Sequence, residues 1–367
     1  MTEGNSEKGI ADIKAILAKT NGNCVINVDP NDSPDARPIV EACKAAGATV
    51  VTQWNKPNDL HPWDFDPNYI AHISFSGVPH GKAMAETLIK SMGGKGGIVA
   101  LGGIESNVPA IERKKGLDEA LKANPDVKLL DYQVANWSAT EALEKTNAWL
   151  TQFGDKITGI WAANDDMGLA AVEALRAAGK AGKVPVTGID GIQLAVEAIL
   201  KKEMAGTVAW DPYWQGGMGL SIGYHAKTGT FDPSKEPKDH REFYGKGVTI
   251  TAENAQSFYD SNVKTEPEAR LERYLGPLQR SDPVRLRSFG RPGARDAGPG
   301  IGRCYVLVPA RKLKTRLDRP KGASASIEPA CAFGQKSVHP GTDPLTSLGP
   351  TKCVCNGEDV GFRCSCA

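Results

Sequence analysis

Polar side chains follow six apolar, strand-like runs, at the point where each run ends. The six clusters are Asn27-Val28-Asp29, Gln53-Trp54-Asn55, Asn136-Trp137, Asn164-Asp165-Asp166, Asp190-Gly191 and Trp210-Asp211-Pro212. Carboxylates and amides can form paired hydrogen bonds with neighbouring hydroxyl groups, and a flat indole can pack on the apolar C–H face of a sugar ring. The clusters therefore indicate a site for a polyhydroxylated ligand.

The cluster at Asn164 also allows a purely structural interpretation. The run "GIWAA" (159–163) has the length of a buried strand, and apolar residues then recur at the 3–4 spacing of an amphipathic helix. Taken alone, Asp165 or Asp166 is expected to cap this helix by accepting hydrogen bonds from its free N–H groups. Ligand contact and helix capping thus compete as roles for the cluster.

The elements that must position these clusters alternate between strand and helix patterns. Helix patterns of about 12–20 residues separate most of the strand-like runs, an order that predicts an α/β fold with parallel sheets covered by helices on both faces. In open sheets of this kind, ligands bind outside the carboxyl ends of the strands. Because polar strand ends recur along the whole chain, two smaller sheets are favoured over one large sheet. The runs span 24–28, 48–53, 71–75, 97–103, 127–135, 159–163, 184–190 and 206–211.

Four motifs carry a resemblance to a known family: "NVPAIERKKGLDEAL", "IWAANDDMGLAAVEALRAAG", "VPVTGIDGIQLAVEAI" and "GTVAWDPYWQGGMG". In order and spacing they resemble the substrate-binding proteins of bacterial sugar ABC transporters, the ribose/galactose-type group with the type I periplasmic-binding fold, over roughly residues 7–265. The resemblance implies two Rossmann-like lobes with a sugar held in the cleft between them. It also implies a periplasmic monomer that works with a membrane permease of an ABC importer, without a cofactor, a metal or nucleic acid.

The same resemblance assigns the ligand contacts, and it raises Asn164 and Asp190 from helix caps to contact residues. Trp54-Asn55 stands where the family has an acidic-basic pair, which argues against ribose itself as the ligand. The polar position before the last crossover is Trp210 or Asp211. The implied contacts are Asn27, Trp54, Asn55, Arg113, Trp137, Asn164, Asp190, Trp210 and Asp211.

The resemblance also sets the expected domains. An amino-terminal lobe is expected from 1–76 with 212–243, and a carboxyl-terminal lobe from 77–211 with 244–265. The opening pattern "GIADIKAILAKTNG" matches the family's second helix, so the first strand and helix are expected to be missing. Loss of a central strand would leave unpaired backbone groups on its neighbours.

The segment 269–367 differs in kind from the rest of the chain. It holds 17 Lys and Arg against 8 Asp and Glu, whereas the remainder holds 27 against 35. A disordered or out-of-frame extension explains this shift better than the alternative of an added metal module. That alternative depends on four closely spaced thiols, those of Cys353, Cys355, Cys364 and Cys366.

The sequence argues against two other classes of protein. An enzyme is not expected, because the sequence has no H-E-x-x-H spacing, no G-x-S-x-G turn and no glycine-rich phosphate loop after a strand. The sensor half of a lactose-repressor-type regulator shares the fold but would need a helix-turn-helix ahead of it. The motif "DPYWQGGMG" favours the transporter component. No apolar run approaches the ~20 residues of a membrane span, and "MTEGNSEKGIADIKAILAK" lacks the basic-then-apolar order of a secretory signal.

Overall fold

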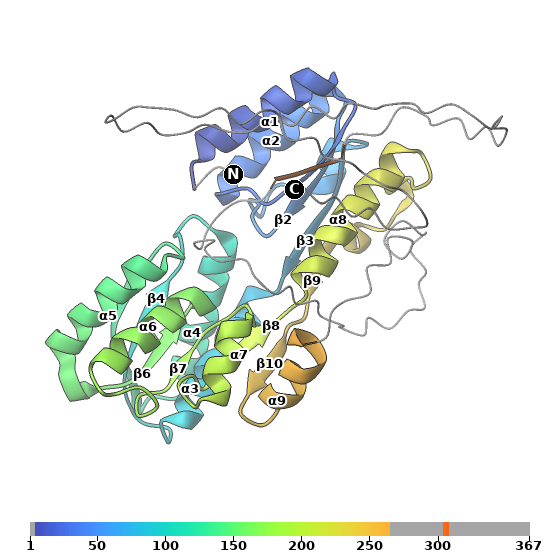
Figure 1. Cartoon of the computed structure of the whole chain (residues 1–367). Helices are drawn as coiled ribbons and strands as arrows, with labels where there is room; N and C mark the ends of the chain where they lie inside the picture. The colour runs from blue at the N-terminus through green and yellow to red at the C-terminus, as the bar shows by residue number, and fades with distance from the viewer. Residues whose placement is uncertain (1–3, 265–303, 308–367) are drawn as a thin grey trace, which may run out of the picture. The chain divides into compact units, whose positions relative to one another are not determined.

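The structure is a computed structural model that describes residues 4–264 and the backbone of 304–307, all within one compact unit, Met1–Arg311. Strands and helices alternate along it as the sequence predicts, and the strands form two mainly parallel sheets (Figure 1). None of the helices in the described part is both long and apolar enough to cross a membrane. Except at 304–307, the predicted tail lies outside the described residues.

The first sheet has the order β11-β1-β2-β3-β9. Strands β1 and β2 run parallel in direct register, with Ile26 opposite Val50. Helices α1 and α2 cover one face of this sheet and α8 covers the other (Figure 1). The elements are α1 (Ser6–Thr20), β1 (Val25–Val28), α2 (Ala36–Ala46), β2 (Thr49–Gln53), β3 (Tyr69–Phe75), α8 (Pro212–Lys227), β9 (Glu242–Gly245) and β11 (Cys304–Leu307).

The second sheet has the order β10-β8-β7-β6-β4-β5, and all its pairs are parallel except β10 with β8. Its helices pack on both faces, around a core that includes the fully buried Trp149 and Trp161. The elements are α3 (Gly77–Ser91), β4 (Gly96–Gly102), α4 (Val108–Ala123), β5 (Val127–Val134), α5 (Ala139–Phe153), β6 (Ile157–Ala162), α6 (Asp165–Ala177), β7 (Val186–Thr187), α7 (Gln193–Leu200), β8 (Gly206–Ala209), β10 (Val248–Thr251) and α9 (Ala255–Phe258).

The chain passes between the two sheets three times. The first two passages come after β3 and after β8, near residues 76 and 211. The third lies between β9, which ends at Gly245 in the first sheet, and β10, which begins at Val248 in the second. This passage comes slightly later than the boundary placed at 243. The division into separately folding lobes stays a prediction.

The sequence did not predict strand β11. It pairs antiparallel with the outer edge of β1, with Val25 opposite Leu307 and Val28 opposite Cys304. We expected unpaired backbone groups in this sheet, and β11 instead supplies hydrogen-bond partners along the β1 edge. The reason is that β1 is buried over its whole length and therefore needs such partners.

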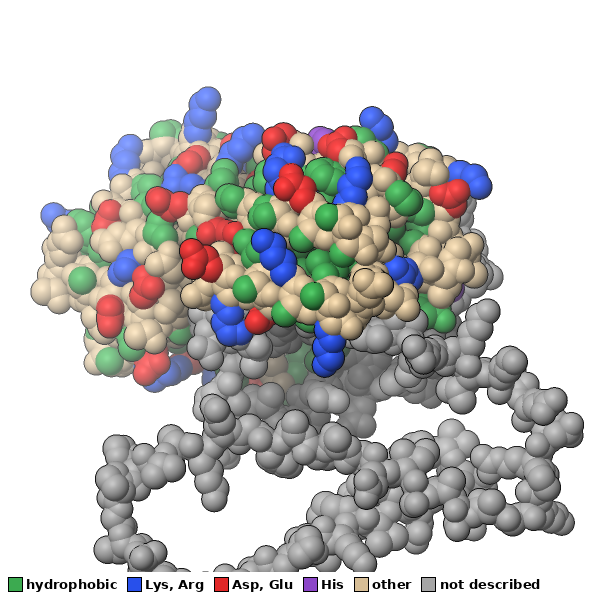
Figure 2. Space-filling model, turned by 90° about the horizontal axis from the view of Figure 1, so that it is seen from above, with side chains coloured by type: hydrophobic (Ala, Val, Ile, Leu, Met, Phe, Trp, Pro, Cys, Tyr) green, Lys and Arg blue, Asp and Glu red, His purple; other side chains and the backbone are tan. Residues whose placement is uncertain are grey.

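Charged side chains are spread over the face of the molecule that Figure 2 shows. On the face seen from above, basic and acidic groups alternate among apolar and neutral ones (Figure 2). Such mixing is typical of a face that meets solvent.

Pairing by β11 leads to a prediction about amide hydrogen exchange at strand β1. A chain ending at residue 302 loses β11, whereas one ending at 311 retains it. We expect faster amide hydrogen exchange at Val25–Val28 in the shorter chain, because edge groups lose their partners, and unchanged exchange at Ile157–Ala162 of the second sheet. Equal exchange at β1 in both chains would show that β11 contributes nothing to this edge.

Candidate functional site

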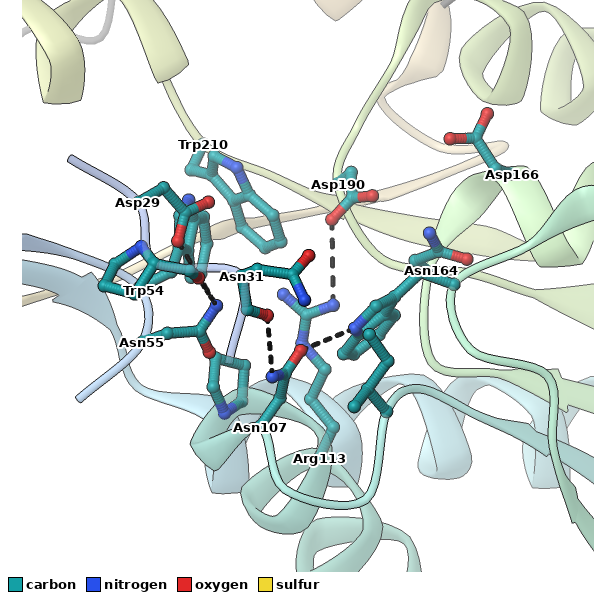
Figure 3. Close-up of a pocket in the computed structure, with 14 residues that line it drawn as sticks. Asp29, Asn31, Trp54, Asn55, Asn107, Arg113, Asn164, Asp166, Asp190 and Trp210 are labelled. Atoms are coloured by element: carbon teal, nitrogen blue, oxygen red, sulfur yellow. Dashed lines mark hydrogen bonds and ion pairs between the residues drawn. The ribbon is translucent and has the colours of Figure 1, made fainter. Parts of the chain in front are cut away.

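A cavity of about 280 Å³ lies at the carboxyl ends of strands from both sheets (Figure 3). The loops after β1 and β2 line one side, and the segments after β4, β5, β6, β7 and β8 line the other. This is the location expected for a ligand site in parallel α/β sheets. The lining residues are Asp29, Pro30, Asn31, Trp54, Asn55, Ile104, Asn107, Pro109, Arg113, Trp137, Asn164, Asp166, Asp190 and Trp210.

Seven of the nine residues assigned by the resemblance line this cavity. Tertiary folding brings them together from positions more than 150 residues apart in the sequence. The seven are Trp54, Asn55, Arg113, Trp137, Asn164, Asp190 and Trp210. Their role in binding stays a prediction, whereas Asn27 and Asp211 lie elsewhere.

Asn27 is buried and does not line the cavity. Its Nδ2 donates to the Gly216 carbonyl of α8 at 3.1 Å, and its Oδ1 accepts from Gln53 Nε2 at 2.6 Å. Side chains alternate between the two faces of a strand, and Asn27 falls on the face that α8 covers. Gly219 leaves room there, since a Cβ at this position would overlap both amides. Asn27 therefore joins β1, β2 and α8.

Asp211 caps a helix. Its Oδ1 accepts from the backbone N–H groups of Tyr213 and Trp214 at 3.0 and 2.9 Å, which are orphan donors in the first turn of α8. Of the two alternatives before this crossover, Trp210 lines the cavity and Asp211 starts the next helix.

Arg113 stands at the centre of the cavity wall (Figure 3). Its guanidinium carbon lies 5.7, 5.4 and 5.2 Å from the ring centroids of Trp54, Trp137 and Trp210, so the cation contacts three indoles. Nη1 donates to the Ala163 carbonyl at 2.7 Å and lies 3.7 Å from Asp190 Oδ1. Nε is buried and has no hydrogen-bond partner among the described residues.

Close packing of two helices fixes the position of Arg113. Helices α3 and α4 meet backbone to backbone, because a Cβ at Gly81 would overlap the Arg113 carbonyl and one at Gly116 would overlap the Val78 carbonyl. A glycine at such a contact lets the backbones approach more closely than any other residue would. The same contact that packs the helices therefore places the guanidinium.

Burial dominates the electrostatics of this wall. It lowers the pKa of Arg113, and the Asp190 carboxylate acts in the opposite direction. Burial raises the pKa of Asp190 although Arg113 opposes the rise. Burial, and to a smaller extent the Arg113 charge, lowers the pKa of His80 to about 4. His80 is therefore neutral at pH 7, and its Nε2 accepts from the Gly247 N–H at 2.9 Å in the third crossover.

The Asn164 cluster contains a helix cap and also reaches the cavity. Asn164, not Asp165 or Asp166, caps α6, with Oδ1 accepting from the Met167 N–H at 3.0 Å, and it also lines the cavity. Asp165 is fully buried, where Thr207 Oγ1 and the Ile192 N–H donate to it at 2.7 and 3.0 Å. Asp165 thereby holds the turn that carries Asp190.

Sequence reasoning missed the loop after β1. Asn107 connects this loop to the second sheet. Its Nδ2 donates to the Asn31 carbonyl at 3.2 Å and to Asp32 Oδ1 at 2.9 Å, and its Oδ1 accepts from Trp137 Nε1 at 2.8 Å.

The loop after β1 also contacts the loop after β2, because Asn55 Nδ2 donates to Asp29 Oδ1 at 3.2 Å. Asp29 and Asp166 both stand in strand-end clusters and could have been found there, whereas nothing in the sequence distinguishes Asn31 or Asn107.

Backbone strain concentrates at the cavity. Trp54, Trp137 and Asp190 have φ angles of +52°, +61° and +145°, and the part of the chain that the structure describes contains only six non-glycine residues with positive φ. Such conformations cost about 1–3 kcal/mol each and persist only where the surroundings impose them. Three such residues at one cavity favour the interpretation of this cavity as a functional site.

Metal-ligating side chains do not gather at one place in the described part of the chain. No group of three or more His, Cys, Asp or Glu among them is placed to hold an ion. The four cysteines at 353, 355, 364 and 366 lie outside the described residues.

Comparison with known proteins identifies similar chains. Residues 2–230 match the family model described as "Periplasmic binding protein domain". A solved structure of a twin-arginine translocation pathway signal protein from Burkholderia phytofirmans is 53% identical, with a TM-score of 0.71 over 80% of this chain and 88% of that one. A periplasmic solute-binding protein of an ABC transporter from Actinobacillus succinogenes, solved with bound D-allose, is 27% identical with a TM-score of 0.61, over 69% of this chain and 86% of that one.

A xylitol-binding protein from Mycolicibacterium smegmatis is 39% identical over 141 residues, which make up 38% of this chain and 40% of that protein. The chain spans between two fifths and about half the length of the first curated relatives it matches. The family consists of binding proteins rather than enzymes.

The helix contact at Gly81 gives a prediction about stability. Gly81→Ala should lower the free energy of unfolding by about 1–3 kcal/mol, because its Cβ would overlap backbone atoms that cannot move independently. Gly216→Ala is the matched control, since no atom lies within 4 Å of a Cβ there and alanine favours the helix. Urea unfolding of both variants is the measurement, and equal stabilities would contradict close packing of α3 on α4.

Asp29 gives a prediction about pH. Burial raises its pKa from 3.8 to about 8, so the folded chain binds a proton that the unfolded chain releases. Its contribution to stability therefore falls as pH rises from about 4 to about 8. In Asp29→Asn, the free energy of unfolding should fall less steeply over this range, as urea unfolding at pH 5, 6, 7 and 8 would show. The exposed Asp126→Asn should retain the wild-type slope, and a wild-type slope in Asp29→Asn would rule out the shift.

Proposed function

Because the chain belongs to the periplasmic binding protein domain family, we propose that it binds a monosaccharide or polyol in this cavity and delivers it to an ABC importer. The observation that carries the proposal is the Arg113 wall. There, Asn164 Nδ2 has no hydrogen bond among the described residues, and the carboxyl groups of Asp166 and Asp190 line the same cavity. An amide donor and two carboxyl groups are thus placed to meet ligand hydroxyls.

The charges of the cavity support a neutral ligand. Asp190 faces the Arg113 charge at 3.7 Å, and burial raises the pKa values of Asp29 and Asp166, which favours their neutral forms. A protonated carboxyl both donates and accepts a hydrogen bond, as a hydroxyl-rich ligand requires.

The lining residues also support binding without catalysis. None of the fourteen is Ser, Thr, Cys, His or Lys, so the cavity wall lacks a nucleophile–base pair of the hydroxyl or thiol kind. Sugar-binding proteins of importers among the relatives favour the transporter over a repressor-type sensor. A periplasmic location and a permease partner follow from this proposal.

A ligand screen tests the proposed function. We expect xylitol, ribitol or D-allose to raise the melting temperature of the full chain in a thermal-shift assay, whereas L-arginine and L-leucine should leave it unchanged. Stabilisation by an amino acid and by none of the sugars or polyols would refute the proposal.

Asp190 is the most informative residue to change. Asp190→Asn removes the negative charge opposite Arg113 and one acceptor for a ligand hydroxyl, so calorimetry should show about ten- to hundredfold weaker binding of the ligand found in the screen. The exposed Asp126→Asn serves as the control and should bind normally. Unchanged affinity in Asp190→Asn would remove this residue from the site.

A further inference from the structure

Two segments that belong to different sheets meet beside the cavity. One is the loop after β1, in the first sheet, and the other is the start of α4, which packs with the second sheet. Asp32 Oδ1 accepts from Asn107 Nδ2 at 2.9 Å and from the Ser106 hydroxyl. The Asn31 carbonyl accepts from the same Asn107 amide at 3.2 Å (Figure 3). Protein groups therefore connect the two sheets across this side of the cavity.

The start of α4 is capped from the other sheet. Asn107 is the N-cap residue of α4, yet its side chain makes no capping hydrogen bond within the helix. Instead, the Val108 N–H, one of the donors that a helix leaves without a partner in its first turn, donates to Ser33 Oγ at 2.9 Å. The Asp32 carboxyl group lies at the same helix end, where the helix dipole favours negative charge. Separation of the two sheets at this point would leave α4 without this cap.

The same contacts fix the position of side chains that line the cavity. Asn107 Oδ1 accepts from Trp137 Nε1 at 2.8 Å, so one residue holds both a loop of the first sheet and an indole of the second. Ser33 is 3% exposed, and its hydroxyl also lies 3.5 Å from Asn55 Oδ1. Asp32 and Ser33 themselves do not line the cavity. A substitution at either residue therefore changes the contact between the sheets and leaves every side chain of the cavity wall in place.

We propose that this contact between the sheets is a clasp that slows ligand release, and that Asp32 and Ser33 are positioning residues within it. The clasp comprises the four hydrogen bonds that Asn31, Asp32 and Ser33 make with Ser106, Asn107 and Val108. Sheets that hold a ligand between them release it by moving apart, and such a movement here breaks all four bonds together. The effect on ligand release rests on the proposed function, whereas the clasp as a cooperative contact does not.

Hydrogen exchange on the full chain tests the clasp without a ligand. Asp32→Ala does not remove the bond between the Val108 N–H and Ser33 Oγ, yet we expect about tenfold faster exchange of the Val108 amide, because the clasp opens as one unit. Asp32→Asn retains an acceptor at Oδ1 and should show a smaller increase. The exposed Asp126→Ala is the control and should leave this amide unchanged. Wild-type exchange at Val108 in Asp32→Ala, with protection retained at Ile157–Ala162, would overturn the clasp.

Ligand release is the second measurement. Xylitol, ribitol and D-allose are the probes, and stopped-flow tryptophan fluorescence follows their dissociation from the full chain. We expect about tenfold faster dissociation from Asp32→Ala, a smaller increase from Asp32→Asn and the wild-type rate from Asp126→Ala. Faster exchange at Val108 with an unchanged dissociation rate would overturn the role in ligand release. Failure of all three probes to bind the wild-type chain would count against the proposed function and the retention role together, whereas the exchange result would stand by itself.

Discussion

The burial of one guanidinium constrains much of the candidate site. Arg113 is 4% exposed, and a charge removed from water costs several kcal/mol unless the protein replaces its hydration. Here the replacement comes from the Ala163 carbonyl, the Asp190 carboxylate and the faces of three indoles. These groups come from five separate segments, so the guanidinium can be stabilised only when both sheets contribute.

That requirement explains the strained backbone nearby. Trp54, Trp137 and Asp190 adopt positive φ angles, and each of them contacts Arg113. An ordinary turn would place these side chains differently, so the contacts with the cation offset the conformational cost. Helix packing through Gly81 and Gly116 then fixes the cation itself. Strain, glycine contacts and the ion pair are therefore parts of one arrangement.

The arrangement also changes how the tryptophans are interpreted. An indole in a sequence suggests a stacking surface for a sugar, yet an indole that stacks on a guanidinium or a phenyl ring is already occupied. In this cavity all three indoles contact Arg113, but only Trp210 is buried, whereas Trp54 and Trp137 keep part of their surface exposed.

The sequence by itself determined the alternation of strands and helices, and hence the sheet edge at which the site lies. Periodicity and strand-end polarity are local properties, and they sufficed to place Trp54, Trp137, Asn164 and Asp190 near one another. The motif resemblance added Arg113. Only the tertiary structure decided that Asn27 faces α8 and that Asp211 caps it, because the face of a strand depends on what packs against it.

The tertiary structure alone also revealed Asn31 and Asn107. Their roles arise from contacts between segments about 75 residues apart, which no local pattern encodes. The pairing of β11 with β1 is of the same kind, since a strand of four residues has little signal of its own and depends on the edge that receives it. Local patterns thus fix which elements form, whereas long-range packing decides which side chains face the ligand.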